Sequence, residues 1–299
     1  EIKGHSIQTT DTDPALYAGS WASGGNLNTA KTGQGGSGTQ TAGIAGGGFT
    51  TTVVTTVETY NGTAWTETAD INTARRNQGQ TGSTTASIIF GGREPTLSAK
   101  TESFNGSSWT ETGDLNTATR QMGDFGSSTA AFCVNGVPFP VSAVQSWDGS
   151  SWTEVTENNT VRQTMAASGA APSTDAVIFG GNGPGLLGVT EQYDGSSWTE
   201  TGDMNTARNE LAGAGSSKSN ALAFAGESPP YTVNTESFDG TSWTEVNNLS
   251  TGKSQSASAG ASNKSALNFG GHDTDGNSLA GTEEWSFPSA PGAQVGQVW

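Results

Sequence analysis

Short apolar runs alternate with stretches of Gly, Ser, Thr and Asn along most of the chain, and the alternation has a fixed period. Each apolar run stops at a glycine pair or its remnant, and successive stops begin 45, 44, 45, 45 and 45 residues apart. These stops are Gly46-Gly47, Gly91-Gly92, Asn135-Gly136, Gly180-Gly181, Ala225-Gly226 and Gly270-Gly271. A regular period of this length predicts six copies of one supersecondary unit.

Three further markers recur in step with the glycine pairs. An aromatic residue occurs at Tyr60, Phe104, Trp147, Tyr193, Phe238 and Trp285. A tryptophan occurs at Trp21, Trp65, Trp109, Trp152, Trp198 and Trp243. A start similar to Asn-Thr-Ala-Arg occurs at Asn28, Asn72, Asn116, Asn159, Asn205 and, as a variant, Ser250.

The order of markers within one repeat predicts four short strands. In residues 71–114 we expect a first strand near 79–82, rich in small residues, and a second at 86–90 that stops at the glycine pair. A third strand is expected near 99–104 and a fourth at 109–111. Asn105-Gly106 lies between the last two, and Asn-Gly or Asp-Gly is a strong hairpin signal because both residues tolerate a positive φ.

A four-stranded unit of about 45 residues is typical of one β-propeller blade. The fold class expected is therefore all-β, a six-bladed propeller with four antiparallel strands per blade. Small residues of the first strands should line the channel, and the aromatic and tryptophan series should pack between blades. The blades expected are 27–70, 71–114, 115–158, 159–203, 204–248, and 249–287 joined by 15–25.

The two ends of the repeat array complement each other. Trp21 has the tryptophan phase but lacks the aromatic partner five positions earlier, whereas Trp285 has the aromatic phase but lacks the later tryptophan. We therefore expect an N-terminal strand to complete the last blade, which removes two exposed sheet edges. Residues 1–14 and 288–299 are expected to lie outside the ring as an N-terminal extension and a C-terminal tail.

The order of glycine pair, Glu-x-aromatic, Trp-Thr-Glu and Arg resembles the kelch repeat. Residues 87–120 carry it as SIIFGGREPTLSAKTESFNGSSWTETGDLNTATR, and the likeness covers about 15–287. The resemblance implies the galactose-oxidase central-domain type of propeller. Only five positions separate the aromatic from the tryptophan, a shorter gap than kelch repeats usually have, which implies a tighter outer hairpin.

Charge narrows the classes of partner. The net charge is −16 with only 12 Lys and Arg residues, so we expect no binding to nucleic acid, which requires cations against phosphate. Binding to an anionic membrane surface is disfavoured for the same reason, and no apolar run is long enough to insert into a bilayer. The single cysteine, Cys133, lies in an apolar run and is expected to be a buried small hydrophobe.

Three enzyme interpretations fit poorly. Copper chemistry of the galactose-oxidase kind needs two histidines and a tyrosine–cysteine crosslink, but the chain has only His5 and His272, and His5 lies outside the predicted ring. A sialidase-like site needs an arginine cluster, whereas Arg75, Arg162 and Arg208 follow the repeat. Glycosidase chemistry needs two carboxylates in different environments. The acids here recur once per blade, at Glu58, Glu102, Glu191, Glu236 and Glu283, with Gln145 in the remaining blade.

The recurring acids are therefore expected to be structural, paired with the repeat-phased arginines or accepting backbone N–H groups. We expect no catalytic residues and no cofactor. One weak calcium candidate exists, because Asp273, Asp275 and Asn277 place oxygen ligands at alternate positions as calcium loops do. A solvated turn is the alternative interpretation of that segment.

One connection varies strongly from blade to blade, the loop between the second and third strands. Its copies are residues 49–54, 93–98, 137–142, 182–189, 227–233 and 272–280. Exposed apolar groups at loop tips are typical of interaction surfaces. The candidate ligand-binding residues on these loops are Arg93, Phe139, Leu186, Leu187, Tyr231 and His272.

Two function classes remain open. The first is a non-enzymatic recognition module that uses these loops to contact a protein or a glycan. The second is a structural or adhesive component of an extracellular assembly, because uniform acidic blades rich in Thr, Ser, Asn and Gly resemble propellers of bacteriophage tail and capsid-decoration proteins. A carbohydrate-active enzyme is a distant third. An extracellular or virion-associated location is expected under either of the first two.

Overall fold

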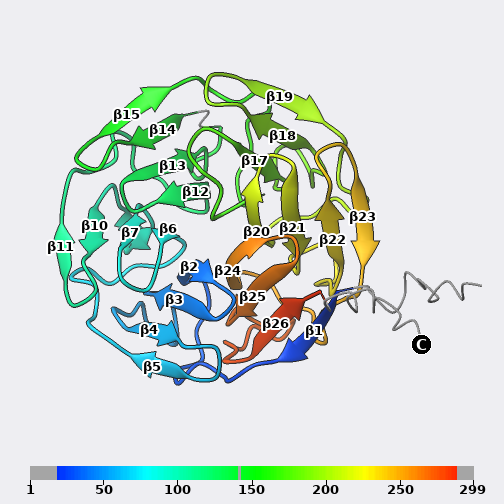
Figure 1. The fold of residues 1–299 in the computed structure, drawn as a ribbon. Coiled ribbons are helices and arrows are strands. Elements are labelled where there is room, and N and C mark those ends of the chain that lie inside the picture. Colours follow the sequence, from blue (N-terminus) through cyan, green and yellow to red (C-terminus); the bar gives the residue numbers. More distant parts are fainter. Residues whose placement is uncertain (1–18, 141–142, 288–299) are drawn as a thin grey trace, which may run out of the picture.

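Six four-stranded antiparallel sheets are arranged in a ring, as expected for a six-bladed propeller (Figure 1). The computed structural model describes residues 19–140 and 143–287. The expected terminal segments, 1–14 and 288–299, lie outside the described residues, as do 15–18 of the expected closing strand. The described part of the chain includes no helix that is long and apolar enough to cross a membrane.

Each blade runs from an inner strand at the channel to an outer strand at the rim. Blade one contains β2 (Gly35–Thr39), β3 (Ala42–Gly46), β4 (Val57–Tyr60) and β5 (Trp65–Glu67). Blade two contains β6 (Gly79–Gly82), β7 (Ser87–Phe90), β10 (Thr101–Phe104) and β11 (Trp109–Glu111). Blade three contains β12 (Gly123–Ser127), β13 (Ala130–Val134), β14 (Val144–Trp147) and β15 (Trp152–Val155).

The remaining three blades follow the same plan. Blade four contains β16 (Ala166–Ala167), β17 (Ala176–Phe179), β18 (Thr190–Tyr193) and β19 (Trp198–Thr201). Blade five contains β20 (Ala212–Ser217), β21 (Asn220–Phe224), β22 (Thr235–Phe238) and β23 (Trp243–Val246). Blade six contains β24 (Ala257–Ser262), β25 (Ser265–Phe269), β26 (Thr282–Ser286) and β1 (Ser20–Ser23). A small extra hairpin, β8 (Arg93–Glu94) and β9 (Thr96–Leu97), decorates blade two.

The repeated sequence markers have local physical roles. Gly79 begins an inner strand where a Cβ would come within 2.5 Å of the Phe90 ring, so only glycine fits this close approach. Gly106 turns the outer hairpin of the same blade with a φ of 95°, a conformation that glycine adopts without steric cost. The strands of blade two therefore lie close to their predicted ranges.

The hydrophobic core is divided among the blade interfaces. Each of the six buried clusters draws its side chains from two adjacent blades. Trp152 of blade three, for example, packs on Phe90 of blade two with ring centroids 4.7 Å apart. Burial of large aromatic rings is the main source of stabilisation in such an arrangement, so each blade depends on its neighbours, as the repeat predicted.

The tryptophans also link the blades through hydrogen bonds. Four indole Nε1–H groups donate across a blade interface to a threonine Oγ1 of the preceding blade at 2.9–3.0 Å. These pairs are Trp21 with Thr235, Trp65 with Thr282, Trp152 with Thr101, and Trp243 with Thr190. Trp109 and Trp198 donate instead to the backbone carbonyls of Ala69 and Thr156. A buried indole N–H needs a partner, and here the partner sets the register between blades.

The N-terminal strand closes the ring as expected. Strand β1 pairs antiparallel with β26, with Trp21 opposite Trp285 in the ladder, and Figure 1 shows the two ends of the described chain side by side in one blade. The indole rings of these two residues lie 5.5 Å apart. The last blade is therefore built from both ends of the chain, and no edge of its central strands is left open.

Blade four departs from its siblings. Its inner strand β16 has two residues, and the turn that follows, residues 168–175, is longer than in the other blades. Gly169 of this turn forms parallel bridges to both Phe125 and Gly215 of the flanking blades. This longer turn therefore contacts both flanking blades, at the end of the channel that carries the inner hairpin turns.

Candidate functional site

The variable loops and the segments that enter each blade lie on one face, called here the loop face. In each blade, one residue of the loop between the second and third strands bridges the residue that precedes the inner strand by a few positions. The bridges are Thr32–Phe49, Arg76–Arg93, Arg120–Val137, Gln163–Asn182, Asn209–Glu227 and Ser254–His272. The loops are thus anchored next to the channel mouth.

A closed circuit of backbone hydrogen bonds surrounds this mouth. The residue after each bridge donates its N–H to the carbonyl of the equivalent residue in the preceding blade, with N···O distances of 2.6–3.2 Å. We call this circuit the mouth ring; its members are Gly33, Asn77, Gln121, Thr164, Glu210 and Gln255. All six residues have a left-handed φ between 49° and 60°. Five of them are not glycine, and such residues rarely adopt this conformation.

The side chains of the mouth ring join across the opening. Gln121 of blade three and Gln255 of blade six both donate to Glu210 Oε1 of blade five, at 3.0 and 2.8 Å. Ser254 Oγ donates to Glu210 Oε2 at 2.7 Å, and Asn77 of blade two reaches Gln255 Oε1 at 3.4 Å. The network places three amides and one carboxylate where a bound ligand at the channel mouth would meet them.

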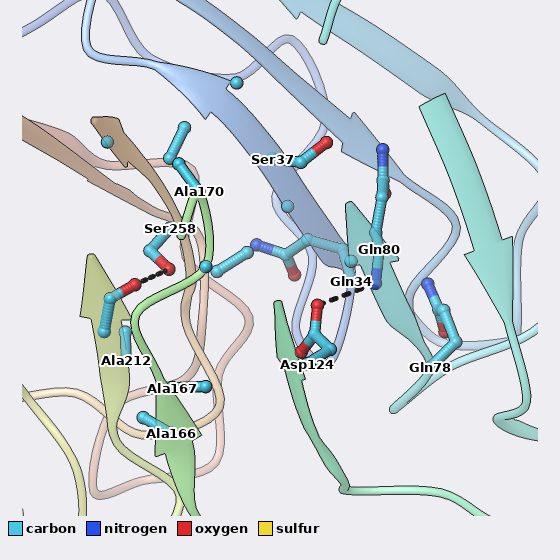
Figure 2. A pocket seen from close by; sticks show the side chains of 18 of the residues that line it. Gln34, Ser37, Gln78, Gln80, Asp124, Ala166, Ala167, Ala170, Ala212 and Ser258 are labelled. Atoms are coloured by element: carbon cyan, nitrogen blue, oxygen red, sulfur yellow. Dashed lines mark hydrogen bonds between the residues drawn. The ribbon is translucent and has the colours of Figure 1, made fainter. Parts of the chain in front are cut away.

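Below the mouth ring the channel has a volume of about 460 Å³. Small residues such as Ala166, Ala167 and Ala212 line one part of the wall, with Gln80 and Asp124 on another, as Figure 2 shows. The Asp124 carboxylate accepts the backbone N–H of Gln80 at 3.1 Å. Burial raises the pKa of Asp124 to about 7, although the hydrogen bond from Gln80 opposes that shift. Asp124 therefore gains or loses its proton near neutral pH.

The structure places the sequence-predicted candidates in three groups on the loop face. Phe139 in blade three and Leu186 in blade four are the exposed large hydrophobic residues of the described chain, at 41% and 37% exposure. Tyr231 and His272, from adjacent loops of blades five and six, pair with ring centroids 5.4 Å apart. Arg93 is exposed in blade two and is bridged to Arg76.

Three of the candidates have structural contacts as well. The N–H of Leu187 donates to the carbonyl of Gly181 within its own loop at 2.9 Å, and Leu187 is half-buried. His272 Nδ1 lies 3.1 Å from the carbonyl of Ser254, and its Nε2 lies 3.5 Å from the Tyr231 hydroxyl. Leu187, Tyr231 and His272 therefore shape the loops, whereas Phe139, Leu186 and Arg93 present side chains outward.

The segment from Asp273 to Asn277 forms a self-capped turn. Asp273 Oδ1 accepts the N–H groups of Asp275 and Asn277, at 3.0 and 2.9 Å, and Oδ2 accepts the Asn277 amide at 3.1 Å. These hydrogen bonds, with that of the Asn277 N–H first, lower the pKa of Asp273. In the described residues no group of three or more His, Cys, Asp or Glu side chains is placed to hold a metal. The hydrogen bonds account for Asp273 as a turn residue.

The recurring acids sit inside the blades, each paired with a buried cation. Three of these cations are the repeat-phased arginines that were predicted as partners, and the other two are lysines. The pairs are Lys31–Glu58, Arg75–Glu102, Arg162–Glu191, Arg208–Glu236 and Lys253–Glu283, with N···O distances of 2.5–3.5 Å. Each acid also accepts the backbone N–H at the marker asparagine or serine of its blade, at 2.6–2.8 Å. Burial lowers the pKa of the cations Lys31, Arg75, Arg162, Arg208 and Lys253, and the paired glutamates oppose that shift.

Blade three replaces this ion pair with two neutral groups. Gln145 takes the position of the acid and accepts the N–H of Asn116 at 2.7 Å. Thr119 takes the position of the cation, and its hydroxyl donates to the carbonyl of Asn135 at 3.1 Å. A lone buried charge is costly, so acid and cation are absent from this blade together.

Sequence reasoning missed the residues closest to the channel mouth. Arg76, Arg120 and the mouth ring were not among the candidates, although a signal was available. The two positions that follow the repeat-phased cation, or Thr119 in its place, read Thr-Gly, Arg-Asn, Arg-Gln, Gln-Thr, Asn-Glu and Ser-Gln. The positions before them barely change. Variation confined to two adjacent positions in every repeat marks a second variable element beside the loops.

Comparison with protein-family models finds no match to the chain, and comparison with curated proteins finds no significant relative.

Proposed function

We propose that this protein is a non-enzymatic recognition module whose loop face binds a protein or a glycan. One observation carries the proposal: five non-glycine residues hold a left-handed backbone in the mouth ring and direct variable side chains to one opening. Backbone strain of this kind costs of order 1 kcal/mol per residue, and it clusters at functional sites. The surrounding loops add exposed Phe139 and Leu186.

Binding is favoured over catalysis by the use of the ionisable groups. The recurring glutamates are engaged in buried ion pairs, away from the opening. At the mouth, Glu210 is held by Gln121, Gln255 and Ser254. Such a network orients hydrogen-bonding groups toward a ligand, which suits recognition.

The test is a glycan array together with affinity capture of protein partners. Phe139→Ala and Leu186→Ala should weaken binding of any partner found, with little change in melting temperature because both side chains are exposed. Ser150→Lys and Ser196→Lys alter the turns of the opposite face and serve as controls. If binding survives both loop variants but is lost in both turn variants, the partner binds to the opposite face and the proposal is wrong.

We also propose that the blades are kelch-like and that the protein acts outside the cell or on a virion. The order of glycine pair, Glu-x-aromatic and Trp-Thr-Glu in each repeat supports the first proposal. The acidic composition, rich in Ser, Thr and Asn, supports the second. The competing function, a structural or adhesive part of such an assembly, is distinguished by imaging the protein in its native particle, where a lone secreted binder would be missing.

A further inference from the structure

Three arginines gather on the loop face of blades two and three; we call Arg76, Arg93 and Arg120 the arginine cluster. Arg76 and Arg93 are bridged by two backbone hydrogen bonds of 3.2 and 2.9 Å. Arg120 holds the position of Arg76 in the next blade and bridges Val137. The carbonyl of Pro95 accepts the Nε–H of Arg93 at 3.0 Å, and the Arg76 guanidinium lies 4.6 Å above the Phe49 ring.

These arginines differ from the other cations of the protein. Five of the twelve Lys and Arg residues are buried in ion pairs. Within the described residues, no member of the arginine cluster forms an ion pair. Burial first, and then Arg93 and Arg76, lower the pKa of Arg120, while burial and Arg93 lower that of Arg76. The three charges therefore repel one another in the free protein.

Glu210, the acid that acts on Arg120, does not neutralise the arginine cluster. Glu210 raises the pKa of Arg120, but its two oxygens already accept hydrogen bonds from Gln121, Gln255 and Ser254. Guanidinium groups that pair with no acid in the described residues, beside a recognition surface, are well suited to an anion, because their planar N–H groups match carboxylate and sulfate oxygens. An anion bound between the three guanidinium groups would offset the repulsion among their charges.

We propose that the arginine cluster binds the anionic group, a carboxylate or a sulfate, of an acidic saccharide; this inference rests on the proposed recognition function. A saccharide fits better than a protein because the face is polar. Protein interfaces derive their energy from buried aromatic and apolar anchors, and the described chain exposes only Phe139 and Leu186 among its large hydrophobic residues. The mouth amides of Asn77, Gln121 and Gln255 instead offer hydrogen bonds suited to hydroxyl groups.

The position of Phe139 supports the same ligand. It lies two residues beyond Val137, the bridge partner of Arg120, so an exposed aromatic ring belongs to the loop next to the arginine cluster. On blades five and six the same face carries Glu227 and Asp273. With a net charge of −16, the protein would repel a densely charged polymer. The ligand is therefore a short acidic saccharide rather than a long polyanion.

The experiment measures binding of three probes by titration calorimetry: an oligogalacturonate, its methyl ester, and a sulfated galactan oligosaccharide. We expect the oligogalacturonate or the sulfated probe to bind, and which of them binds identifies the anionic group. The methyl ester should bind at least tenfold more weakly than the oligogalacturonate if the carboxylate is recognised. Raising the salt concentration should weaken binding of the anionic probe.

The matched variants remove two positive charges each. Arg93→Gln with Arg120→Gln should weaken binding of the anionic probe about a hundredfold, because each lost charge-assisted contact corresponds to roughly tenfold. Lys218→Gln with Lys264→Gln removes the same charge from the inner hairpin turns of the opposite face and should change binding less than twofold. Both double variants should keep the parental melting temperature.

Several outcomes overturn the inference. These are equal binding of acid and ester with no sulfated probe bound, equal losses in the two double variants, or binding of an Asp/Glu-rich peptide in place of every acidic saccharide. Failure of the anionic subsite alone can be told apart from failure of the recognition function. If a neutral saccharide binds and loses affinity in Phe139→Ala but not in Arg93→Gln with Arg120→Gln, recognition by the loop face stands and the anionic subsite falls.

Discussion

Trp21 donates its indole N–H to the hydroxyl of Thr235 at 3.0 Å, across 214 positions of sequence and from the last blade to the fifth. Trp21 is half-buried, and its ring packs edge-on against Phe224 at 4.9 Å. The same pairing recurs between Trp65 and Thr282 inside the ring. The closing strand is therefore tied to the ring both by its own ladder and by a contact to the neighbouring blade.

Trp21→Ala should lower the free energy of unfolding by about 2–4 kcal/mol, since it removes aromatic packing and leaves a cavity. Thr235→Val should cost about 1 kcal/mol, because only the hydrogen bond is lost. Denaturant unfolding monitored by tryptophan fluorescence measures both. If Trp21→Ala unfolds at the same denaturant concentration as the parent, the contact does not hold the closing blade.

Deletion of residues 1–26 should leave β26 as an open edge and lower the melting temperature. A synthetic peptide of residues 15–26 added to the truncated protein should raise the melting temperature again, because a ligand that binds only the native state stabilises it. A peptide in which Trp21 is replaced by alanine is the control. An unchanged melting temperature after truncation contradicts the closure of the ring by β1.

The neutral pair of blade three predicts how the buried ion pairs respond to substitution. Glu236→Gln alone should destabilise the protein by about 3–5 kcal/mol, because Arg208 becomes an unpaired buried charge. The double change Glu236→Gln with Arg208→Thr reproduces Gln145 and Thr119 and should recover more than 1 kcal/mol of that loss. A double-mutant cycle of unfolding free energies measures the coupling, and strictly additive losses would contradict it.

Asp124 predicts a specific pH dependence of stability. Its pKa is about 7 in the folded protein and near 4 when unfolded, so the folded state binds more protons between these values. The stabilisation contributed by protonated Asp124 should be fully present below about pH 4 and be lost as the pH rises through 7. Asp124→Asn should remove this slope and stabilise the protein at pH 8 by on the order of 2–4 kcal/mol. Unfolding curves of the parent and of Asp124→Asn, measured from pH 4 to 8, test this prediction. If the variant keeps the slope of the parent, Asp124 is not the cause of the pH dependence.

Calcium should leave the melting temperature unchanged, with or without a chelator. Both carboxylate oxygens of Asp273 accept hydrogen bonds from its own turn, so binding calcium would require these bonds to break. Differential scanning calorimetry in excess calcium and in chelator makes the comparison. A rise in melting temperature with calcium that disappears in Asp273→Ala would restore the cation site.

The architecture was accessible from sequence because its determinants are local and repeated. Gly106 and Trp152 have counterparts at the same repeat positions in other blades, where the turn glycines also have a positive φ and the tryptophans are also buried, so position within the repeat predicts environment. The functional face was only partly accessible. Arg93 and Phe139 were found in the variable loops. The Arg76–Arg93 bridge joins segments that the loop pattern does not specify, and so does the hydrogen bond from Gln121, next to Arg120, to Asn77, next to Arg76. The left-handed backbone at Asn77 and Glu210 carries no clear residue signature.

The mouth ring also links the number of blades to a closed series of hydrogen bonds. Its six hydrogen bonds run in one rotational sense and return to their starting residue, from Gly33 through Gln255. Genes with near-identical repeats readily gain or lose a copy by unequal recombination. A seventh or a missing blade would change the angle between neighbouring mouth-ring residues, and with it the N···O distances over which the present circuit closes. Closure of the mouth ring at the axis therefore favours six blades. Because the ring uses backbone groups, each blade remains free to change the side chain that it contributes there.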